Sequence, residues 1–205
     1  SPAPMKTLLS LFIFFLIAMI PLGPIQASFL PKAKKFEIPS KVEGHNLLKD
    51  EMFEWSFQTS ASQNHNGFKG TVVSFLSSKC PCSNSHLKHL IDLQEKFPQF
   101  LFIGVHSNKK GKKKEIQSFF RTKKFSFPLL FDSSLELANS FRALKTPHTF
   151  VISEKGELLF HGGITNSINF KFATKFYLRE SLSRLSNKKP LEQIYARAIG
   201  CSITR

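Results

Sequence analysis

The sequence contains little cysteine. Only three cysteines occur among its 205 residues, which excludes the dense cross-linking of a small disulfide-rich scaffold. A chain of this length buries enough apolar surface to fold without such cross-links. Cys80 and Cys82 are separated by a single proline, and Cys201 follows far along the chain. In an oxidising compartment, an odd number of cysteines indicates reactive thiols rather than structural bridges.

Acidic side chains are scarce as well. Aspartate and glutamate number 14 against 29 lysines and arginines, which gives a formal net charge of +15. Such an excess suits binding to nucleic acid or anionic lipid, or serves solubility alone. The densest basic run, Lys109–Lys114, is expected to be a solvated loop or a docking surface for acidic partners or an anionic membrane. We expect no nucleic-acid partner, because the N-terminal pattern indicates export.

Long apolar runs are limited to one. Residues 8–20 are almost entirely apolar, follow Lys6 and precede the small residue Ala27. This pattern predicts a secretory signal peptide over residues 5–27, and the run is short for a membrane span, which needs about 20 residues. We therefore expect a periplasmic or other extracytoplasmic location, with a membrane tether if the signal is not cleaved. Residues 1–4 are expected to be a cloning scar or an upstream extension.

Beyond residue 46, the hydrophobic pattern alternates between buried strands and amphipathic helices. Strands are predicted over residues 71–76, 100–105, 127–131, 149–152 and 157–161, and helices over residues 85–96, 113–124, 134–143 and 170–185. Alternating strands and helices imply parallel pairing, and the late hairpin adds antiparallel strands. We predict an α/β fold over residues 46–186, with a mixed central sheet flanked by helices on both faces. A lead-in segment, residues 28–45, precedes it, and a C-terminal tail, residues 187–205, carries Cys201.

Cys80 lies where a buried strand ends and a helix begins. The unpaired N–H groups and the dipole of a helix N-terminus favour negative charge there, and Lys79 adds a positive neighbour. A thiol in this field ionises more readily, and the thiolate is the reactive form. Pro81 suits the first helical turn, where its missing N–H costs nothing. The sequence therefore predicts Cys80 as an activated nucleophile.

Four segments resemble exported thioredoxin-like proteins of the TlpA/ResA and AhpC-TSA/redoxin type. They are Gly67–Pro81, Val105–Asn108, Leu144–Ile152 and Ser153–Leu158. The resemblance implies a thioredoxin-like fold in which the Thr146–Pro147 bond is cis, faces the active cysteine and aligns a partner chain. It also implies protein thiols or disulfides as substrates and a redox partner protein. No metal or organic cofactor is required by such chemistry.

The sequence departs from the thioredoxin pattern around its cysteines. The position of the usual second cysteine, three residues after Cys80, is Ser83, and Cys82 comes one residue early. Lys79 stands where a tryptophan is usual, and Ser74 falls near the place of a buried acid. The detailed chemistry is therefore expected to differ from that of thioredoxin.

Three uses of Cys82 remain open. It can pair with Cys80 in a strained ring, stand by while Cys201 resolves Cys80, or join Cys80 in binding a metal. The segment Gly200–Arg205 resembles the ending of some redoxin-like exported proteins, which makes Cys201 a candidate resolving thiol on a mobile tail.

These observations predict an exported thiol–disulfide oxidoreductase. Cys80 is the expected nucleophile, Cys82 or Cys201 the resolving thiol, and Thr146 with Pro147 the substrate loop. The residues expected to support Cys80 are Lys79, Pro81 and Ser77.

A peroxiredoxin-like thiol peroxidase is the first alternative. Ser77 matches the hydroxyl residue that peroxiredoxins carry three positions before their reactive cysteine. Val73 stands where they carry a proline, and Pro147 stands where they carry an arginine. The last difference favours the oxidoreductase, although Arg142 or Arg121 could take the place of that arginine in space.

A copper-handling module is the second alternative. Thiolates with a nearby histidine suit Cu(I), and the candidates are His86, His89, His148 and His161. The Sco group of copper chaperones, however, has a longer spacing between its cysteines. A binding protein that kept only the fold is disfavoured by the presence of Cys80.

Overall fold

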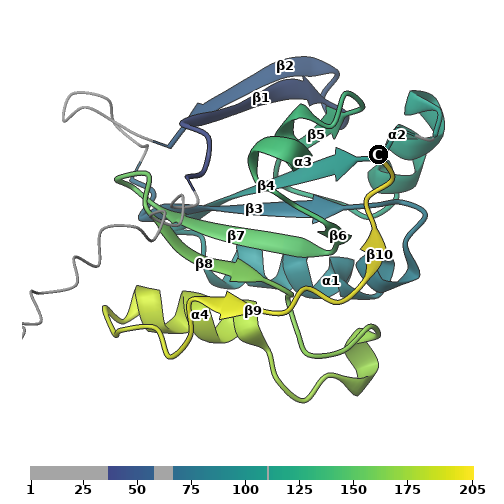
Figure 1. Cartoon of the computed structure of the whole chain (residues 1–205). Helices are drawn as coiled ribbons and strands as arrows, with labels where there is room; N and C mark the ends of the chain where they lie inside the picture. Colours follow the sequence, from purple (N-terminus) through teal and green to yellow (C-terminus); the bar gives the residue numbers. More distant parts are fainter. Residues whose placement is uncertain (1–36, 58–66, 110) are drawn as a thin grey trace, which may run out of the picture. The chain divides into compact units, whose positions relative to one another are not determined.

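The described residues form an eight-stranded mixed sheet and a separate pair of short strands (Figure 1). The computed structural model describes residues 37–57, 67–109 and 111–205, so the expected signal peptide lies outside it. The sheet order is β2-β1-β5-β4-β3-β7-β8-β9, and β10 pairs with β6. The strands are β1 (Lys41–Asn46), β2 (Glu51–Ser56), β3 (Gly70–Leu76), β4 (Phe100–Ser107), β5 (Leu129–Asp132), β6 (Lys145–Thr146), β7 (His148–Ser153), β8 (Leu158–Gly162), β9 (Tyr195–Ala196) and β10 (Cys201–Ser202).

Three parallel strands, β5, β4 and β3, lie at the centre of the sheet. They are connected through α1 (Pro81–Lys96) and α2 (Lys113–Arg121), and the usual right-handed crossover places both helices on one face. β7 runs antiparallel to β3, with Val73 opposite Phe150. Every residue of β3 is buried, as expected for a strand covered on both faces. The predicted α/β fold with a mixed sheet is confirmed.

Helices cover both faces of this sheet. Leu90 of α1, Phe120 of α2 and Leu182 of α4 (Tyr177–Ser186) belong to one hydrophobic core. α3 (Glu136–Ser140) lies on the opposite face, and Figure 1 shows it below β1 and β2 and above β4. Phe141, which follows it, makes edge-to-face contacts with Phe57, Phe75 and Phe150. None of the helices in the described ranges combines the length and the apolar character that a membrane crossing requires.

The sheet begins earlier in the chain than the sequence predicts. Residues 28–45 are expected to be a lead-in segment, whereas β1 starts at Lys41 and pairs with both β2 and β5. Asn46 fixes this strand, because its Oδ1 accepts hydrogen bonds from the backbone N–H groups of Leu48 and Leu129 at 3.1 and 3.3 Å. The irregular burial along β1 gives no clear period, so its pairing is not visible in the sequence.

The single helix predicted over residues 170–185 is wrong in its first half. Phe170–Phe172 forms a short 3₁₀ helix, η1, and α4 begins only at Tyr177. Between them, the Oδ1 of Asn166 accepts hydrogen bonds from the backbone N–H groups of Thr174 and Lys175, both at 3.0 Å. Because a loop side chain binds these N–H groups, the helix starts later than the periodicity indicates.

The segment expected to be a C-terminal tail takes part in both sheets. β9 lies parallel to β8 at the edge of the main sheet. The chain then crosses to the other end of the strands, where β10 pairs with β6 (Figure 1). Residues 187–205 are therefore part of the folded domain rather than an appendage.

Candidate active site

Cys80 is the N-cap residue of α1 and follows the end of β3. Its exposed fraction is 2 %, and the backbone N–H of Ser83 donates a hydrogen bond to its sulfur at 3.3 Å. A helix N-terminus favours negative charge, so this contact favours the thiolate. Ser83 is held in turn, because its Oγ accepts a hydrogen bond from the backbone N–H of Ser77 at 3.1 Å. Ser83 therefore supports Cys80 through its backbone N–H, a role that no motif in the sequence indicates.

The loop before β7 faces Cys80. The peptide bond between Thr146 and Pro147 is cis. The backbone carbonyl of Thr146 lies 3.1 Å from the Sγ of Cys80, within hydrogen-bonding distance of a thiol. The strand β6, which ends at Thr146, therefore borders the Cys80 sulfur directly.

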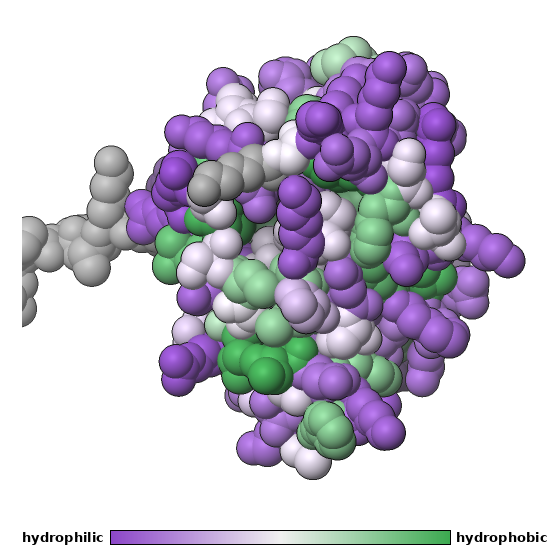
Figure 2. Space-filling model, turned by 90° about the vertical axis from the view of Figure 1, so that its right-hand side faces the viewer, coloured by the Kyte–Doolittle hydropathy of each residue, from purple (hydrophilic) through white to green (hydrophobic). Residues whose placement is uncertain are grey.

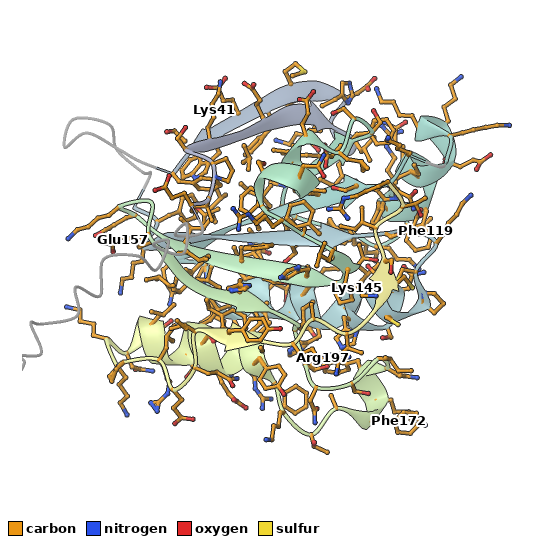
Figure 3. All side chains as sticks on the ribbon, viewed as in Figure 1. Lys41, Phe119, Lys145, Glu157, Phe172 and Arg197 are labelled. Carbon is orange, nitrogen blue, oxygen red and sulfur yellow. The ribbon has the colours of Figure 1, made fainter. Side chains whose placement is uncertain are left out.

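The C-terminal strand β10 covers the free edge of β6. The two strands are antiparallel, with Cys201 opposite Thr146 and Ser202 opposite Lys145. The Nζ of Lys145, labelled in Figure 3, donates a hydrogen bond to the Oγ of Ser202 at 2.9 Å. The next residue, Ile203, is buried and donates its backbone N–H to the carbonyl of Leu144 at 3.0 Å. This pairing holds Cys201 next to the Thr146–Pro147 turn.

Gly200 allows this close approach. A Cβ atom at this position would lie 2.0 Å from the carbonyl oxygen of Thr146 and 3.3 Å from the Cδ of Pro147. No real side chain tolerates the first distance, so any other residue here would push β10 away from β6. Gly200 is therefore required by close packing against Thr146, and the sequence alone does not show this requirement.

The three cysteines meet in space. The Sγ atoms of Cys80, Cys82 and Cys201 all lie within 4.8 Å of one another, and each thiol is free. We call this group the three-sulfur cluster. Cys80 is buried, while Cys82 and Cys201 are partly exposed, so the cluster opens to solvent on one side.

The three thiols differ in acidity. Burial alone would raise the pKa of Cys80, but hydrogen bonds from Cys201, from the Thr146 side chain and from the backbone N–H of Ser83 outweigh it and hold that pKa below its usual range. Burial and the charge of Cys80 raise the pKa of Cys82. Burial, a hydrogen bond with Cys80 and the charge of Cys80 raise the pKa of Cys201 to about 12. The first proton to leave the cluster is therefore that of Cys80.

The sequence pattern that defines the AhpC/TSA family matches residues 32–161, more than half of the chain. The chain belongs to the AhpC/TSA family. A comparison with curated proteins found no match.

Solved structures similar to this AhpC/TSA chain share its fold at low sequence identity. An uncharacterized conserved protein from Geobacillus kaustophilus is 19 % identical, with 82 % of this chain and 90 % of that one covered and a TM-score of 0.69. A hypothetical protein from Sinorhizobium meliloti is 17 % identical, with 82 % and 92 % covered and a TM-score of 0.69. A putative thiol:disulfide interchange protein DsbE from Chlorobium tepidum is 16 % identical, with 74 % and 94 % covered and a TM-score of 0.52. The predicted thioredoxin-like fold is thereby confirmed.

The histidines considered as copper ligands do not join the cluster in this AhpC/TSA chain. Among the described residues, only cysteines make up the group of potential metal ligands there. His86 contacts the carbonyl of Cys82 through Nδ1 at 2.8 Å and the Oγ1 of Thr165 through Nε2 at 2.7 Å. His89 packs against Phe170, with ring centroids 4.5 Å apart. The other two, His148 and His161, pack against Phe150 of β7.

The residues expected to support Cys80 contribute unequally. Ser77 shapes the turn, because its carbonyl accepts the backbone N–H of Cys80 at 3.3 Å. Pro81 occupies the first turn of α1 as expected. Lys79 is exposed, and neither it nor Arg121 or Arg142 is among the main causes of the lowered pKa of Cys80. Backbone and thiol hydrogen bonds, rather than a neighbouring cation, therefore set the acidity of this thiol.

Apolar side chains lie exposed near the cluster. Leu144 precedes β6 and is 59 % exposed, and Ile168 and Phe172 are 59 % and 69 % exposed. The Oγ of Ser85, in the second turn of α1, accepts a hydrogen bond from the backbone N–H of Phe170 at 3.3 Å, which ties the loop that carries Ile168 and Phe172 to the helix. Figure 2 views the side of the molecule on which β6 and β10 lie, where hydrophobic side chains stand among hydrophilic ones. Phe172 marks the outer edge of this surface in Figure 3.

Proposed function

We propose that this chain is an exported thiol–disulfide oxidoreductase in which Cys80 is the nucleophile and Cys201 resolves the intermediate. The observation that carries the proposal is the pairing of β10 with β6, which holds the Cys201 sulfur within 4.8 Å of the Cys80 sulfur. Export is inferred from the signal-peptide pattern of residues 5–27.

The reaction consists of two exchanges of sulfur bonds. The Cys80 thiolate attacks one sulfur of a substrate disulfide, a mixed disulfide forms, and the second substrate sulfur leaves as a thiolate. Cys201 then attacks the Cys80 sulfur and releases the first substrate sulfur as a thiolate. The substrate gains two electrons, and the protein is left with a Cys80–Cys201 disulfide. A partner dithiol must reduce that disulfide to complete the cycle.

The Cys201 thiol becomes more acidic once the mixed disulfide has formed, which is when it must act as a nucleophile. Besides burial, a hydrogen bond and the negative charge of Cys80 raise the pKa of Cys201. When Cys80 enters a mixed disulfide, it loses its charge, so both of these effects end and the pKa of Cys201 falls. A resolving thiol that ionises only after the first exchange avoids competing with Cys80 for the substrate.

Cys82 is less well placed to resolve Cys80. It belongs to the first turn of α1, and its carbonyl accepts hydrogen bonds from the Oγ of Ser85 at 3.0 Å and from His86 when Nδ1 carries the proton. A disulfide with Cys80, only two residues away, would have to distort this turn and the cap contact of Ser83. Cys201 reaches Cys80 from a separate strand and leaves the helix intact.

Mass mapping of the disulfide tests this assignment. The reduced protein is treated with one equivalent of a disulfide-bonded peptide, the remaining thiols are blocked, and the chain is cut with trypsin. Cys80 and Cys82 fall in one tryptic peptide, between Lys79 and Lys88, so Cys82→Ser is needed to identify the partner of Cys201. We expect a Cys80–Cys201 link in the wild type and in Cys82→Ser, and no exchange in Cys80→Ser. Exchange in Cys80→Ser at the wild-type rate would contradict the proposal.

A thiol peroxidase is the second candidate. The observation in its favour is that β10 already occupies the edge of β6 beside Pro147, so a small peroxide reaches Cys80 more easily than a protein chain does. Peroxide consumption by the reduced protein, with a sulfenic acid trapped at Cys80 in the Cys201→Ser variant, would support it. If reduced protein consumes no peroxide but exchanges with disulfides, the oxidoreductase stands alone.

For protein substrates, we propose that the exposed apolar side chains around Leu144, Ile168 and Phe172 form the docking edge. The basic run Lys109–Lys114 remains a proposed contact for an anionic membrane surface. We propose no nucleic-acid partner, because the signal-peptide pattern of residues 5–27 indicates export.

A further inference from the structure

The fold brings three sulfurs together although the proposed disulfide chemistry uses two. They come from the end of β3, the first turn of α1 and the distant strand β10. No local motif accounts for this convergence. The Cys82 thiol, which takes no part in the two exchanges, completes a triangle with sides of at most 4.8 Å.

The spacing of the cluster suits one metal ion. A thiolate binds a Zn²⁺-sized ion at about 2.3 Å, and three sulfurs placed around such an ion in one plane are about 4.0 Å apart. Starting from at most 4.8 Å, the sulfurs must move together by less than about 1 Å. Cys201 can supply this movement, because β10 is only two residues long and pairs with β6 alone.

We propose that the reduced three-sulfur cluster binds one Cu(I) ion through three thiolates. Thiolates are soft ligands that select Cu(I) or Zn²⁺ over Mg²⁺, Ca²⁺ and Mn²⁺. A structural zinc site completes a tetrahedron with a fourth protein ligand. Within the described ranges, no histidine, aspartate or glutamate joins the three cysteines. The donor set therefore fits a soft ion that accepts three ligands.

The surroundings favour an anionic complex of this kind. The N–H of Ser83, at the positive end of α1, points at the Cys80 sulfur. Lys145 lies on β6 beside β10 and brings a positive charge to the same edge. Cys82 and Cys201 are partly exposed, so an ion reaches the cluster from solvent. Binding releases the protons that remain on the thiols.

Cu(I) binding goes beyond the proposed oxidoreductase function, because the same cluster would then exist either as a metal complex or as a disulfide. Metal binding and disulfide formation exclude each other, because both use the sulfurs of Cys80 and Cys201. A substrate disulfide that takes two electrons from these thiolates would remove two ligands and release the ion.

The test is a titration of the reduced full chain with Cu(I) alone, without oxygen and in competition with a coloured Cu(I) chelator. We expect one ion per chain, and X-ray absorption should show three sulfur neighbours at about 2.3 Å. Cys82→Ser and Cys201→Ser should each weaken binding at least tenfold. Ser183→Ala, which changes an exposed hydroxyl on α4 outside the β10–β6 pairing, is the matched control and should bind as the wild type does.

Only two sulfur neighbours around the copper in the wild type would overturn the proposal, and this result does not depend on how well any variant folds. Unchanged Cu(I) affinity in Cys201→Ser would also overturn it. Preferential binding of Zn²⁺ in the same titration would overturn the choice of ion. Disulfide exchange is measured separately without metal, so Cu(I) binding without exchange refutes only the proposed function, and exchange without Cu(I) binding refutes only this inference.

Discussion

Cys80 and Cys201 are neighbours in space but are held in very different ways. Cys80 lies between a fully buried strand and a helix of sixteen residues, and it is itself the cap of that helix. Cys201 lies on a two-residue strand that pairs with another two-residue strand. The first position is rigid because the main sheet defines it. The second depends on the few contacts of β10 with β6 and on the backbone bond from Ile203 to Leu144.

The two thiols also differ in acidity, and each is responsible for part of the other's shift. Burial opposes ionisation of both thiols, yet the hydrogen bond between them lowers the pKa of Cys80 and raises that of Cys201. When Cys80 and Cys201 share one proton, the proton stays on Cys201, because the N-terminus of α1 stabilises the thiolate of Cys80. Removing either sulfur should therefore change the titration of the other.

The largest expected effect is on this titration. Cys80→Ser removes the thiolate, whose charge and charge-assisted hydrogen bond help to raise the pKa of Cys201, so that pKa should fall from about 12 toward its ordinary 9.0 and remain above it because burial persists. The change in proton affinity is up to about a thousandfold. The ultraviolet absorbance of the thiolates, followed against pH, measures it. A Cys201 thiol that still titrates near 12 in Cys80→Ser would show that the two sulfurs are not coupled.

The next effect concerns the position of β10. Gly200→Ala places a Cβ atom 2.0 Å from the carbonyl oxygen of Thr146, so β10 must move away from β6 by an ångström or more. A displacement of about 1 Å slows a positioned reaction by up to about a hundredfold. In rapid-mixing experiments, we expect attack by Cys80 to persist while release of the mixed disulfide slows.

Gly44→Ala is the matched control for this substitution, because a Cβ there meets only Leu130 at an ordinary 3.6 Å. It should leave both steps unchanged. Equal slowing in the two variants would mean that the pairing of β10 does not position Cys201.

The same contrast explains what the sequence could reveal. The strand before Cys80, the helix after it and the Thr146–Pro147 turn follow from hydrophobic periods and from a family resemblance, both of which are properties of continuous segments. A two-residue strand such as β10 has no period, and the need for Gly200 exists only because the Thr146 carbonyl lies against it. The sequence indicated Cys201 as a candidate partner of Cys80, but the contacts that position Cys201 join segments far apart in the chain.

A smaller effect is expected on stability. Ile203 is 5 % exposed, and replacing a buried isoleucine by alanine costs about 2 kcal/mol at the lower end of the usual range. The lower end applies because β10 lies at the margin of the fold and can relax. Denaturant unfolding of the reduced protein should show this loss in Ile203→Ala. Ile194→Ala, at a site 71 % exposed, should change the free energy of unfolding by less than about 0.5 kcal/mol. Equal losses would mean that Ile203 does not anchor the C-terminal segment.

The smallest effect on exchange is expected from Cys82→Ser. Its backbone stays in the first turn of α1, where the carbonyl contacts with Ser85 and His86 do not depend on the sulfur. Loss of the third thiol also removes little of the environment that lowers the pKa of Cys80, because the hydrogen bonds that lower it come from Cys201, Thr146 and the N–H of Ser83. Disulfide exchange measured without metal should therefore stay within about threefold of the wild type, whereas Cys201→Ser should accumulate the mixed disulfide. The opposite result, with Cys82→Ser stalled and Cys201→Ser turning over, would move the resolving role to the helix and make the strand β10 a cover for the site.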